Sequence, residues 1–238
     1  MIGILLATLG IFRQLPSDGK WWYDSRIHNL GNIGPFGKFH ANIAGWCTDV
    51  IDKYAYNKRN IRDELLSKMP HNARVCDMGC GVGKSTTDNI LSIGIDTSDE
   101  MLEVARKDNK DKLCTFTNGN AISYGEDDEF DYSTIFFLLH EAPQDGRIAI
   151  IENAMRISER GVLIVDMHPK MRTPKTMLSG EPYVLNYMKH IRADINKCCY
   201  NNDWHMHDTY THVDDYVMVW ALRPNKQVNT RLSAGAIV

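Results

Sequence analysis

The chain has 238 residues, of which 43% are hydrophobic and 24% are charged. These values are ordinary for a globular protein, and the length suits one α/β domain with additions at its ends better than two enzymatic domains. The formal net charge is −3 and no long block of Lys and Arg occurs. We therefore expect no nucleic-acid partner, because binding a phosphate backbone needs a basic surface.

Two segments precede the expected catalytic core. Residues 1–12, MIGILLATLGIF, are almost wholly apolar but shorter than the roughly 20 residues of a membrane-spanning helix. They could pack on the domain as a helix or make a shallow peripheral contact with a membrane. Residues 17–37 are rich in glycine and predict an irregular segment, followed by a helix at 39–55. Residues 1–55 are therefore predicted to form a cap or lid.

The six cysteines lack paired CxxC spacing, so reduced thiols are the simplest account of them. This favours a cytoplasmic protein, which could also associate with membranes through its apolar start.

From Met69 onward, short apolar runs alternate with helical stretches, a pattern typical of βα units and a parallel sheet. The core is placed at residues 56–223 and a flexible tail at 224–238. The pattern predicts strands at 74–77, 91–96, 114–117, 132–138 and 162–166. Helices are predicted directly after Gly83, at 99–108 and at 145–157, and Thr97 with Glu100 predicts a capping box at the second of them.

A mostly helical insertion is expected at residues 171–197, before two antiparallel strands at 204–213 and 216–222. Its apolar side chains could line a substrate pocket or belong to the ordinary core. The predicted fold class is α/β. It has a Rossmann-like, seven-stranded, mostly parallel sheet with helices on both faces, an N-terminal helical cap and a helical insertion after the fifth strand.

The run from Asp77 to Gly83, DMGCGVG, places three glycines at alternate positions after an apolar strand. Glycine lets the backbone turn tightly and lie against a ligand. A phosphate-binding loop of the P-loop type would need glycine where Met78 stands. A dinucleotide-binding loop would need it where Lys84 stands, so neither pattern fits.

The DxGCGxG run resembles motif I of class I S-adenosylmethionine-dependent methyltransferases, over roughly residues 70 to 170. The resemblance implies S-adenosylmethionine as the cofactor and S-adenosylhomocysteine as the product. It places Asp77 near the methionine half of the cofactor and Asp96 on the ribose hydroxyls. Asn120 stands where the family commonly has Asp facing the adenine amino group; it could accept that bond or be a plain turn residue. The other cofactor-binding candidates are Tyr23, Gly79, Cys80, Gly81, Gly83, Thr97, Met101, Ala121 and Phe137.

The candidate catalytic residues follow the strand at 132–138. Ligands of open α/β sheets lie at the carboxyl ends of the strands, which is where His140 and Glu141 are expected. Methyl transfer requires alignment and, for an oxygen nucleophile, removal of a proton. His140 is a candidate base whose ring Glu141 could orient, or it shapes the cofactor pocket through hydrogen bonds alone. His168 is a second candidate.

Aromatic residues before the core, Trp21, Trp22 and Tyr23, could exclude water and attract a sulfonium through cation–π contact. Alternatively, they pack the N-terminal segment onto the core. His205, His207 and His212 lack a carboxylate or cysteine to complete a metal-ligand set, so no metal site is expected.

The segments FFLLHEAP and VDMHP look like the ubiquinone/menaquinone-type methyltransferase group, and like the rhodoquinone-biosynthesis branch. The predicted function is in-line transfer of a methyl group from S-adenosylmethionine to a small, apolar or amphipathic acceptor. One alternative is a protein that binds S-adenosylmethionine without methyl transfer. A macromolecular methyltransferase is disfavoured because no Asn/Asp-Pro-Pro-aromatic segment follows the strand. The acceptor, the methylated atom and the oligomeric state stay open.

Overall fold

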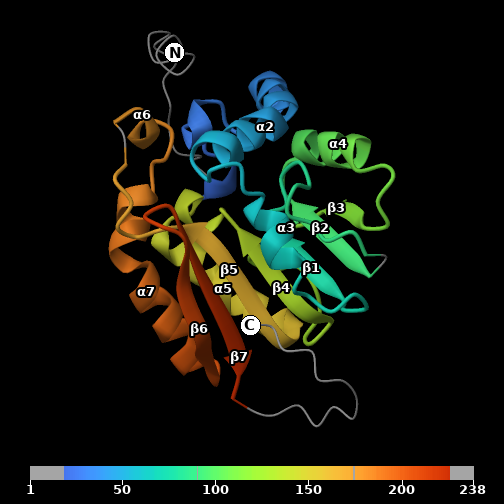
Figure 1. Ribbon diagram of the computed structural model, residues 1–238, viewed down its shortest axis with the longest axis vertical. Helices are drawn as coiled ribbons and strands as arrows, with labels where there is room; N and C mark the ends of the chain where they lie inside the picture. Colours follow the sequence, from blue (N-terminus) through green and yellow to red (C-terminus); the bar gives the residue numbers. More distant parts are fainter. Residues whose placement is uncertain (1–18, 90, 174, 226–238) are drawn as a thin grey trace.

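A computed structural model describes residues 19–225, apart from residues 90 and 174. Its centre is a seven-stranded sheet with the order β3-β2-β1-β4-β5-β7-β6 (Figure 1). The parallel strands are β1 (Val75–Met78), β2 (Ser92–Asp96), β3 (Thr115–Asn118), β4 (Phe130–Phe136) and β5 (Ser158–Met167). β7 (Val217–Pro224) runs antiparallel to both β5 and β6 (Trp204–Val213). The predicted α/β fold class is confirmed.

Helices cover both faces of this sheet. α5 (Gln144–Ile157) and α7 (Val184–Asn201) lie behind the sheet in Figure 1, where Ile150 and Ile191 join the main buried cluster. α3 (Ile61–Leu66) lies on the opposite face and buries Leu65 against the cluster that contains Val165. α4 (Asp99–Asp108) packs beside β2 and β3. Burial of apolar side chains on both faces is what the parallel sheet requires.

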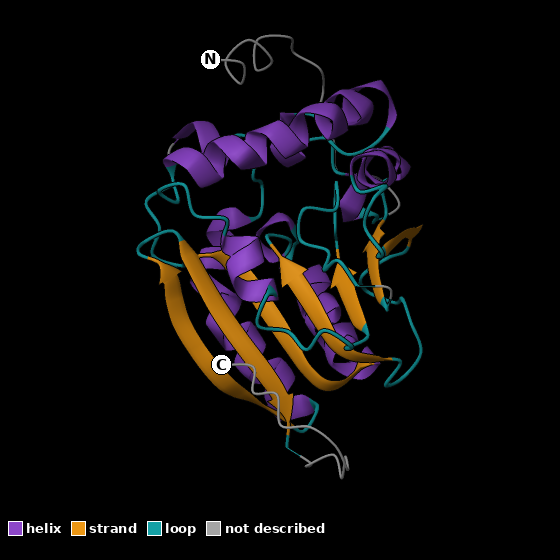
Figure 2. Cartoon of the chain, turned by 45° about the vertical axis from the view of Figure 1, so that its right-hand side comes forward, coloured by secondary structure: helices purple, strands orange, loops and turns teal. Residues whose placement is uncertain are grey.

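A long helix, α2 (Gly34–Tyr54), crosses the carboxyl ends of the parallel strands (Figure 2). It begins five residues before the predicted start at residue 39. Pro35 stands in its first turn, where a missing backbone N–H costs nothing. Two 3₁₀ turns precede it, η1 (Trp21–Tyr23) and η2 (Ile27–Asn29). We call residues 19–33 the N-terminal segment.

The predicted insertion contains the short helix α6 (Lys175–Leu178) and the first part of α7. Several polar contacts join it to the N-terminal segment. Among them, His28 N–H donates to the Gly180 carbonyl at 2.7 Å, and the Tyr183 hydroxyl donates to the buried Asp24 carboxylate at 2.9 Å. Two parts of the chain that are distant in sequence therefore join above the sheet.

Two local predictions are wrong. Residues 84–89 form bends instead of the helix expected after Gly83, because the Ser85 and Thr86 hydroxyls donate to Asp77 below them. The cap of α4 is Ser98 rather than Thr97, since the Ser98 hydroxyl accepts from Met101 N–H at 3.1 Å. The predicted boundaries of the cap, core and tail stay predictions, and residues 1–12 lie outside the described residues.

Candidate active site

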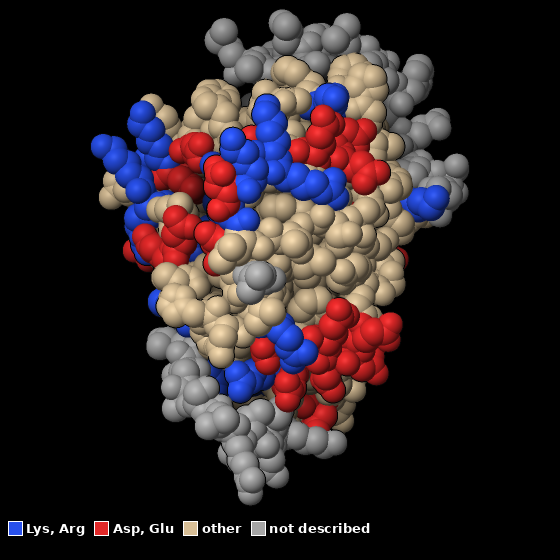
Figure 3. All heavy atoms as spheres, turned by 90° about the vertical axis from the view of Figure 1, so that its right-hand side faces the viewer, with Lys and Arg blue, Asp and Glu red and all other residues tan. Residues whose placement is uncertain are grey.

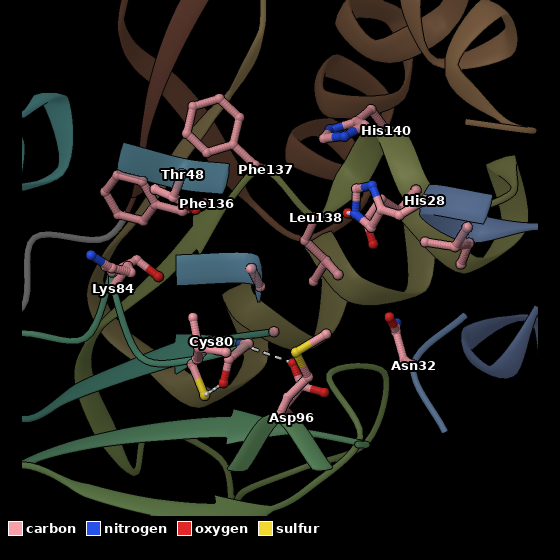
Figure 4. Close-up of a pocket in the computed structure, with 18 of the residues that line it drawn as sticks. His28, Asn32, Thr48, Cys80, Lys84, Asp96, Phe136, Phe137, Leu138 and His140 are labelled. Atoms are coloured by element: carbon pink, nitrogen blue, oxygen red, sulfur yellow. Dashed lines mark hydrogen bonds and ion pairs between the residues drawn. The ribbon is translucent and has the colours of Figure 1, made fainter. Parts of the chain in front are cut away.

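A cavity of about 700 Å³ lies between α2 and the carboxyl ends of the strands. It lies at the carboxyl end of β1, whose neighbours in the sheet are β2 on one side and β4 on the other. The strand order therefore reverses at β1, because β2 and β3 follow on one side and β4 and β5 on the other. Such a switch point is the usual ligand site of an open α/β sheet. Figure 4 shows Cys80 and Asp96 on one side of the cavity and Phe137 and His140 on another.

The glycine loop after β1 forms part of the cavity wall. Gly81 has φ +51°, and nothing lies within 4 Å of the place where a Cβ would stand. Its backbone can therefore approach a ligand closely. Gly79 and Cys80 also line the cavity, whereas Gly83 does not. A Cβ on Gly83 would lie 2.7 Å from the Phe116 ring, so this glycine permits close packing instead of contacting a ligand.

Asp96 ends β2 and faces the cavity beside the glycine loop. One carboxylate oxygen accepts from Gly81 N–H and the other from Ser98 N–H, both at 2.9 Å. Burial opposes the charged form and raises the pKa of Asp96 to about 6, against the lowering effect of these two bonds. Each oxygen keeps a second lone pair, so the carboxylate can still accept bonds from a ligand.

Asp77, in contrast, lies beneath the loop and does not line the cavity. Its carboxylate is 1% exposed and accepts bonds from the hydroxyls of Thr86 (2.6 Å), Ser85 (2.9 Å) and Thr134 (3.3 Å). Burial raises its pKa despite these donors. The contact with the methionine half of a cofactor that the resemblance implied stays a prediction, and in the structure Asp77 ties the loop to β4.

The cavity wall beyond Asp96 contains four more of the predicted cofactor residues: Thr97, Met101, Asn120 and Ala121. The Asn120 side-chain oxygen accepts from Ile122 N–H at 3.1 Å and so also stabilises the turn after β3. The two roles considered for Asn120, cavity wall and turn residue, are therefore compatible.

The N-terminal segment covers one side of the cavity. Trp21 and Trp22 line it, but Tyr23 does not. The Tyr23 hydroxyl donates a long bond of 3.5 Å to the Thr97 carbonyl, at the edge of the site. Trp21 packs so closely on α5 that a Cβ on Gly146 would lie 2.5 Å from its ring. Tyr23 thus holds the segment in place, and its tryptophan neighbours face the cavity.

His140 lies in η3 (Leu139–Glu141), directly after β4. Its Nδ1 lies 2.6 Å from the Asp166 carboxylate, which also accepts from Leu139 N–H. Burial opposes the imidazolium, but Asp166 outweighs it and raises the pKa of His140 to about 9. The prediction that Glu141 orients this ring is wrong. Glu141 is bonded to His28 instead, and Asp166 at the end of β5 is the group that orients the His140 ring.

Glu141 pairs instead with His28, whose Nε2 lies 2.7 Å from Glu141 Oε1. The His28 Nδ1 lies 2.9 Å from Oε1 of Glu181, so one imidazole bridges two carboxylates. Burial opposes the charge on His28, but the carboxylates outweigh it and raise its pKa well above the usual value. The same ion pair lowers the pKa of Glu141 against the effect of its burial. His28 also has a φ of +49°, a strained conformation for a residue with a side chain.

Sequence reasoning did not select several residues that line the cavity. Glu181 gave no signal, since an isolated glutamate in a helical insertion is ordinary. His28 had been noted only as part of the N-terminal segment. Others that line the cavity are Asn32, His40, Thr48, Tyr56, Arg62, Lys84, Leu138, Met167, Met171 and Tyr216, whereas the second candidate base, His168, does not line it. Contacts with residues far along the chain place these side chains, so their own sequence neighbourhood carries no pattern.

Comparison with known proteins relates part of the chain to a protein family. Residues 75–161 match the family model of a methyltransferase domain. No curated protein sequence matches the chain.

Several solved structures share the fold. A magnesium protoporphyrin IX methyltransferase from Synechocystis PCC 6803, with bound S-adenosylmethionine, has a TM-score of 0.58 and 17% identity, covering 83% of this chain and 94% of that one. The PH0226 protein from Pyrococcus horikoshii OT3 has a TM-score of 0.55 and 16% identity, covering 73% and 93% of the two chains. The [4+2]-cyclase SpnF has a TM-score of 0.54 and 12% identity, covering 69% and 79%. At such identities the likeness establishes the fold alone.

The matched domain begins at β1 and contains the glycine loop, Asp96, Asn120 and His140. This part of the chain is therefore similar to a methyltransferase domain, and it lies within a seven-stranded α/β fold.

Proposed function

We propose that the protein transfers a methyl group from S-adenosylmethionine to a small, apolar or amphipathic acceptor bound in the cavity. The observation that carries this proposal is a single cavity of about 700 Å³ with two chemically different ends. One end is polar and contains Asp96 with the glycine loop. The other has mainly aromatic and thioether walls, together with an ionisable group formed by His28, His140, Glu141 and Glu181. The aromatic and thioether side chains are those of Tyr56, Phe137, Met167, Met171 and Tyr216. A volume of this size suits two small molecules held together.

The polar end fits the cofactor. The Asp96 carboxylate can accept both ribose hydroxyls, and the open backbone at Gly81 allows close approach of the adenosine. Met101 and Ala121 offer apolar walls for the adenine, with Asn120 beside them. S-adenosylmethionine supplies an activated methyl group on a positively charged sulfur. The protein's task is to align an acceptor atom with that group and to exclude water.

The apolar end is assigned to the acceptor. Trp21 and Trp22 close the cavity on the side of the N-terminal segment, and aromatic rings there exclude water. His140, with its Nδ1 fixed by Asp166, belongs to the wall of this end together with Glu141. We assign both residues to positioning the acceptor. An apolar pocket of this kind supports an acceptor such as that of the ubiquinone/menaquinone-type group, which stays a proposal.

Neither the surface charge nor the length of the helices indicates a partner other than the proposed small acceptor. On the face shown in Figure 3, Lys and Arg side chains are mixed with Asp and Glu above a broad uncharged area, and mainly acidic side chains gather below it. This face does not favour a nucleic-acid partner. No helix in the described part of the chain is long and apolar enough to cross a membrane. The cytoplasmic location and the peripheral membrane contact through residues 1–12 stay predictions.

The first experiment measures cofactor binding by calorimetry with S-adenosylmethionine, S-adenosylhomocysteine and NAD. We expect micromolar binding of the two sulfur compounds and its loss in Asp96→Ala. The exposed Asp108→Ala on α4 serves as a matched control that binds normally. Failure of both sulfur compounds to bind would overturn the proposal, and binding of NAD in their place would indicate a dehydrogenase.

Turnover needs a separate measurement, because a [4+2]-cyclase shares the fold. Labelled methyl transfer is to be tested with quinols, phenols, amines and thiols. Tight cofactor binding with no transfer to any acceptor would favour the alternative of a binding protein without methyl transfer.

A further inference from the structure

Three side chains at the acceptor end converge from separate parts of the chain. His28 comes from the N-terminal segment, Glu141 from η3 and Glu181 from the connection between α6 and α7. Each offers one ligand atom, and these atoms all lie within 4.8 Å of one another. All three residues line the cavity. The fold therefore gathers one imidazole and two carboxylates at one point of the wall.

One atom of this group lacks a partner. Glu181 is only 7% exposed, and its Oε2 makes no hydrogen bond within the part of the chain that the structure describes. His140 Nε2 lies 3.9 Å from this oxygen, which is too long for a hydrogen bond. A buried carboxylate oxygen without a partner is costly, and native proteins rarely leave one. The orphaned oxygen points to a cation or donor that belongs beside it.

His140 has the support that metal-binding histidines usually have. Its Nδ1 is held at 2.6 Å by the Asp166 carboxylate. An outer carboxylate of this kind holds the ring so that Nε2, once it has lost its proton, can act as a ligand. This Nε2 lies 3.9 Å from the orphaned oxygen of Glu181. His140 is thus a fourth potential ligand beside the three converging side chains.

The donor set discriminates between ions. Two imidazole nitrogens with carboxylate oxygens suit divalent transition metals such as Zn²⁺ and Mn²⁺. Ca²⁺ and Mg²⁺ prefer sites made of oxygen alone. We infer that His28, His140, Glu141 and Glu181 bind one divalent transition-metal ion at the acceptor end of the cavity. The sequence had led us to expect no metal site, because His205, His207 and His212 lack a carboxylate or cysteine to complete a ligand set.

The ion would give the acceptor end a Lewis acid. It would take the place of the His28 ion pairs, with the imidazole binding it through one nitrogen. If the proposed function holds, the same ion can bind and polarise an oxygen of the acceptor. The metal site itself does not depend on methyl transfer, so it can be tested without cofactor or acceptor.

The test uses the full chain, stripped of metal with a chelator and titrated with Mn²⁺ or Zn²⁺ by calorimetry. We expect one ion per chain, confirmed by elemental analysis after dialysis. Glu181→Gln and His28→Gln should each weaken binding by at least about tenfold. His207→Gln and Glu103→Gln replace exposed residues of the same types and should bind like the wild type. Absence of saturable binding to the wild type, or equal binding by wild type and Glu181→Gln, would overturn the inference.

A second measurement needs no variant and covers the case in which substitution disturbs folding. Co²⁺ bound by nitrogen and oxygen ligands shows weak visible bands, whereas thiolate ligands add an intense charge-transfer band. Cys80 also lines the cavity and is the competing ligand there. We expect the weak bands alone. An intense thiolate band, or no visible band at all, would contradict the site.

Discussion

Asp96 is the residue that most directly couples the fold to ligand binding. Burial raises its pKa to about 6, and ribose hydroxyls donate to the charged carboxylate. Above this pKa the free protein is ready to bind; below it a proton must first be lost. We expect the affinity for S-adenosylhomocysteine to be greatest above pH 7 and to fall below pH 6, by up to about tenfold per pH unit.

Calorimetry from pH 5 to pH 8 measures this profile. Asp96→Asn should bind more weakly and lose the part of the pH dependence that the carboxylate causes. Parallel profiles for wild type and Asp96→Asn would show that another group governs the pH dependence.

Asp77 is predicted to act on stability rather than on the cofactor. Its removal in Asp77→Ala leaves the buried hydroxyls of Ser85, Thr86 and Thr134 without their acceptor. Each unsatisfied buried group costs about 1 kcal/mol or more, so we expect a loss of about 3 kcal/mol in the free energy of unfolding. Asp77→Asn keeps one acceptor oxygen and should lose less. Urea denaturation measures both variants.

The same variants decide between two roles for Asp77. In protein that is still folded, the cofactor affinity of Asp77→Asn should stay closer to wild type than that of Asp96→Asn. A larger loss of affinity than in Asp96→Asn, at unchanged stability, would instead support the direct cofactor contact expected from the resemblance.

At the scale of elements, the docking of the N-terminal segment on α5 can be tested with two helical glycines. Alanine in a helix is favoured over glycine by up to about 1 kcal/mol. At Gly45 in α2 a new Cβ would meet only Lys84 Cε at 3.5 Å, so Gly45→Ala should stabilise the protein. At Gly146 the Cβ would lie 2.5 Å from the Trp21 ring, which must move. Gly146→Ala should therefore destabilise the N-terminal segment despite the gain in helix propensity.

Limited proteolysis and tryptophan emission report this difference. Gly146→Ala should be cleaved faster within residues 19–33 and should show red-shifted emission, and the emission change should vanish in a Trp21→Phe background. Equal behaviour of the two glycine variants would show that Trp21 is not docked on α5.

Sequence patterns predicted best the elements that are determined by residues within the element itself. The strand at 204–213 agrees with β6 at both ends, and the helix at 99–108 agrees with α4, because apolar spacing and capping residues determine them. The cap was misplaced by one residue because Thr97 and Ser98 are both hydroxyl residues, and only the backbone geometry distinguishes them. The helix after Gly83 was wrong for a different reason. Hydrogen bonds to Asp77, which no local pattern reveals, hold Ser85 and Thr86 in a non-helical conformation.

The candidate site shows the same division at the scale of the whole molecule. Gly81, Asp96 and Asn120 each follow a strand, so the order of strands was enough to place them at one edge of the sheet. His28 pairs with Glu141 across 113 positions in the sequence. Its location depends on how the N-terminal segment folds back over the sheet, which apolar spacing does not encode. The aligned strand ends were therefore predictable, and the cap that completes the cavity was not.

The same architecture predicts how the whole molecule responds to its cofactor. The cavity joins the N-terminal segment to the ends of β1, β2 and β3, whereas residues 204–208 pair with the far end of β7. Within minutes of labelling, hydrogen exchange reports local opening rather than global unfolding. Added S-adenosylhomocysteine should slow early exchange in residues 19–33, 79–82, 96–101 and 119–121, and leave residues 204–208 unchanged. Asp96→Ala should show none of these changes at the same ligand concentration. Protection confined to the strand ends, with residues 19–33 unaffected, would show that the N-terminal segment covers the cavity without responding to the cofactor.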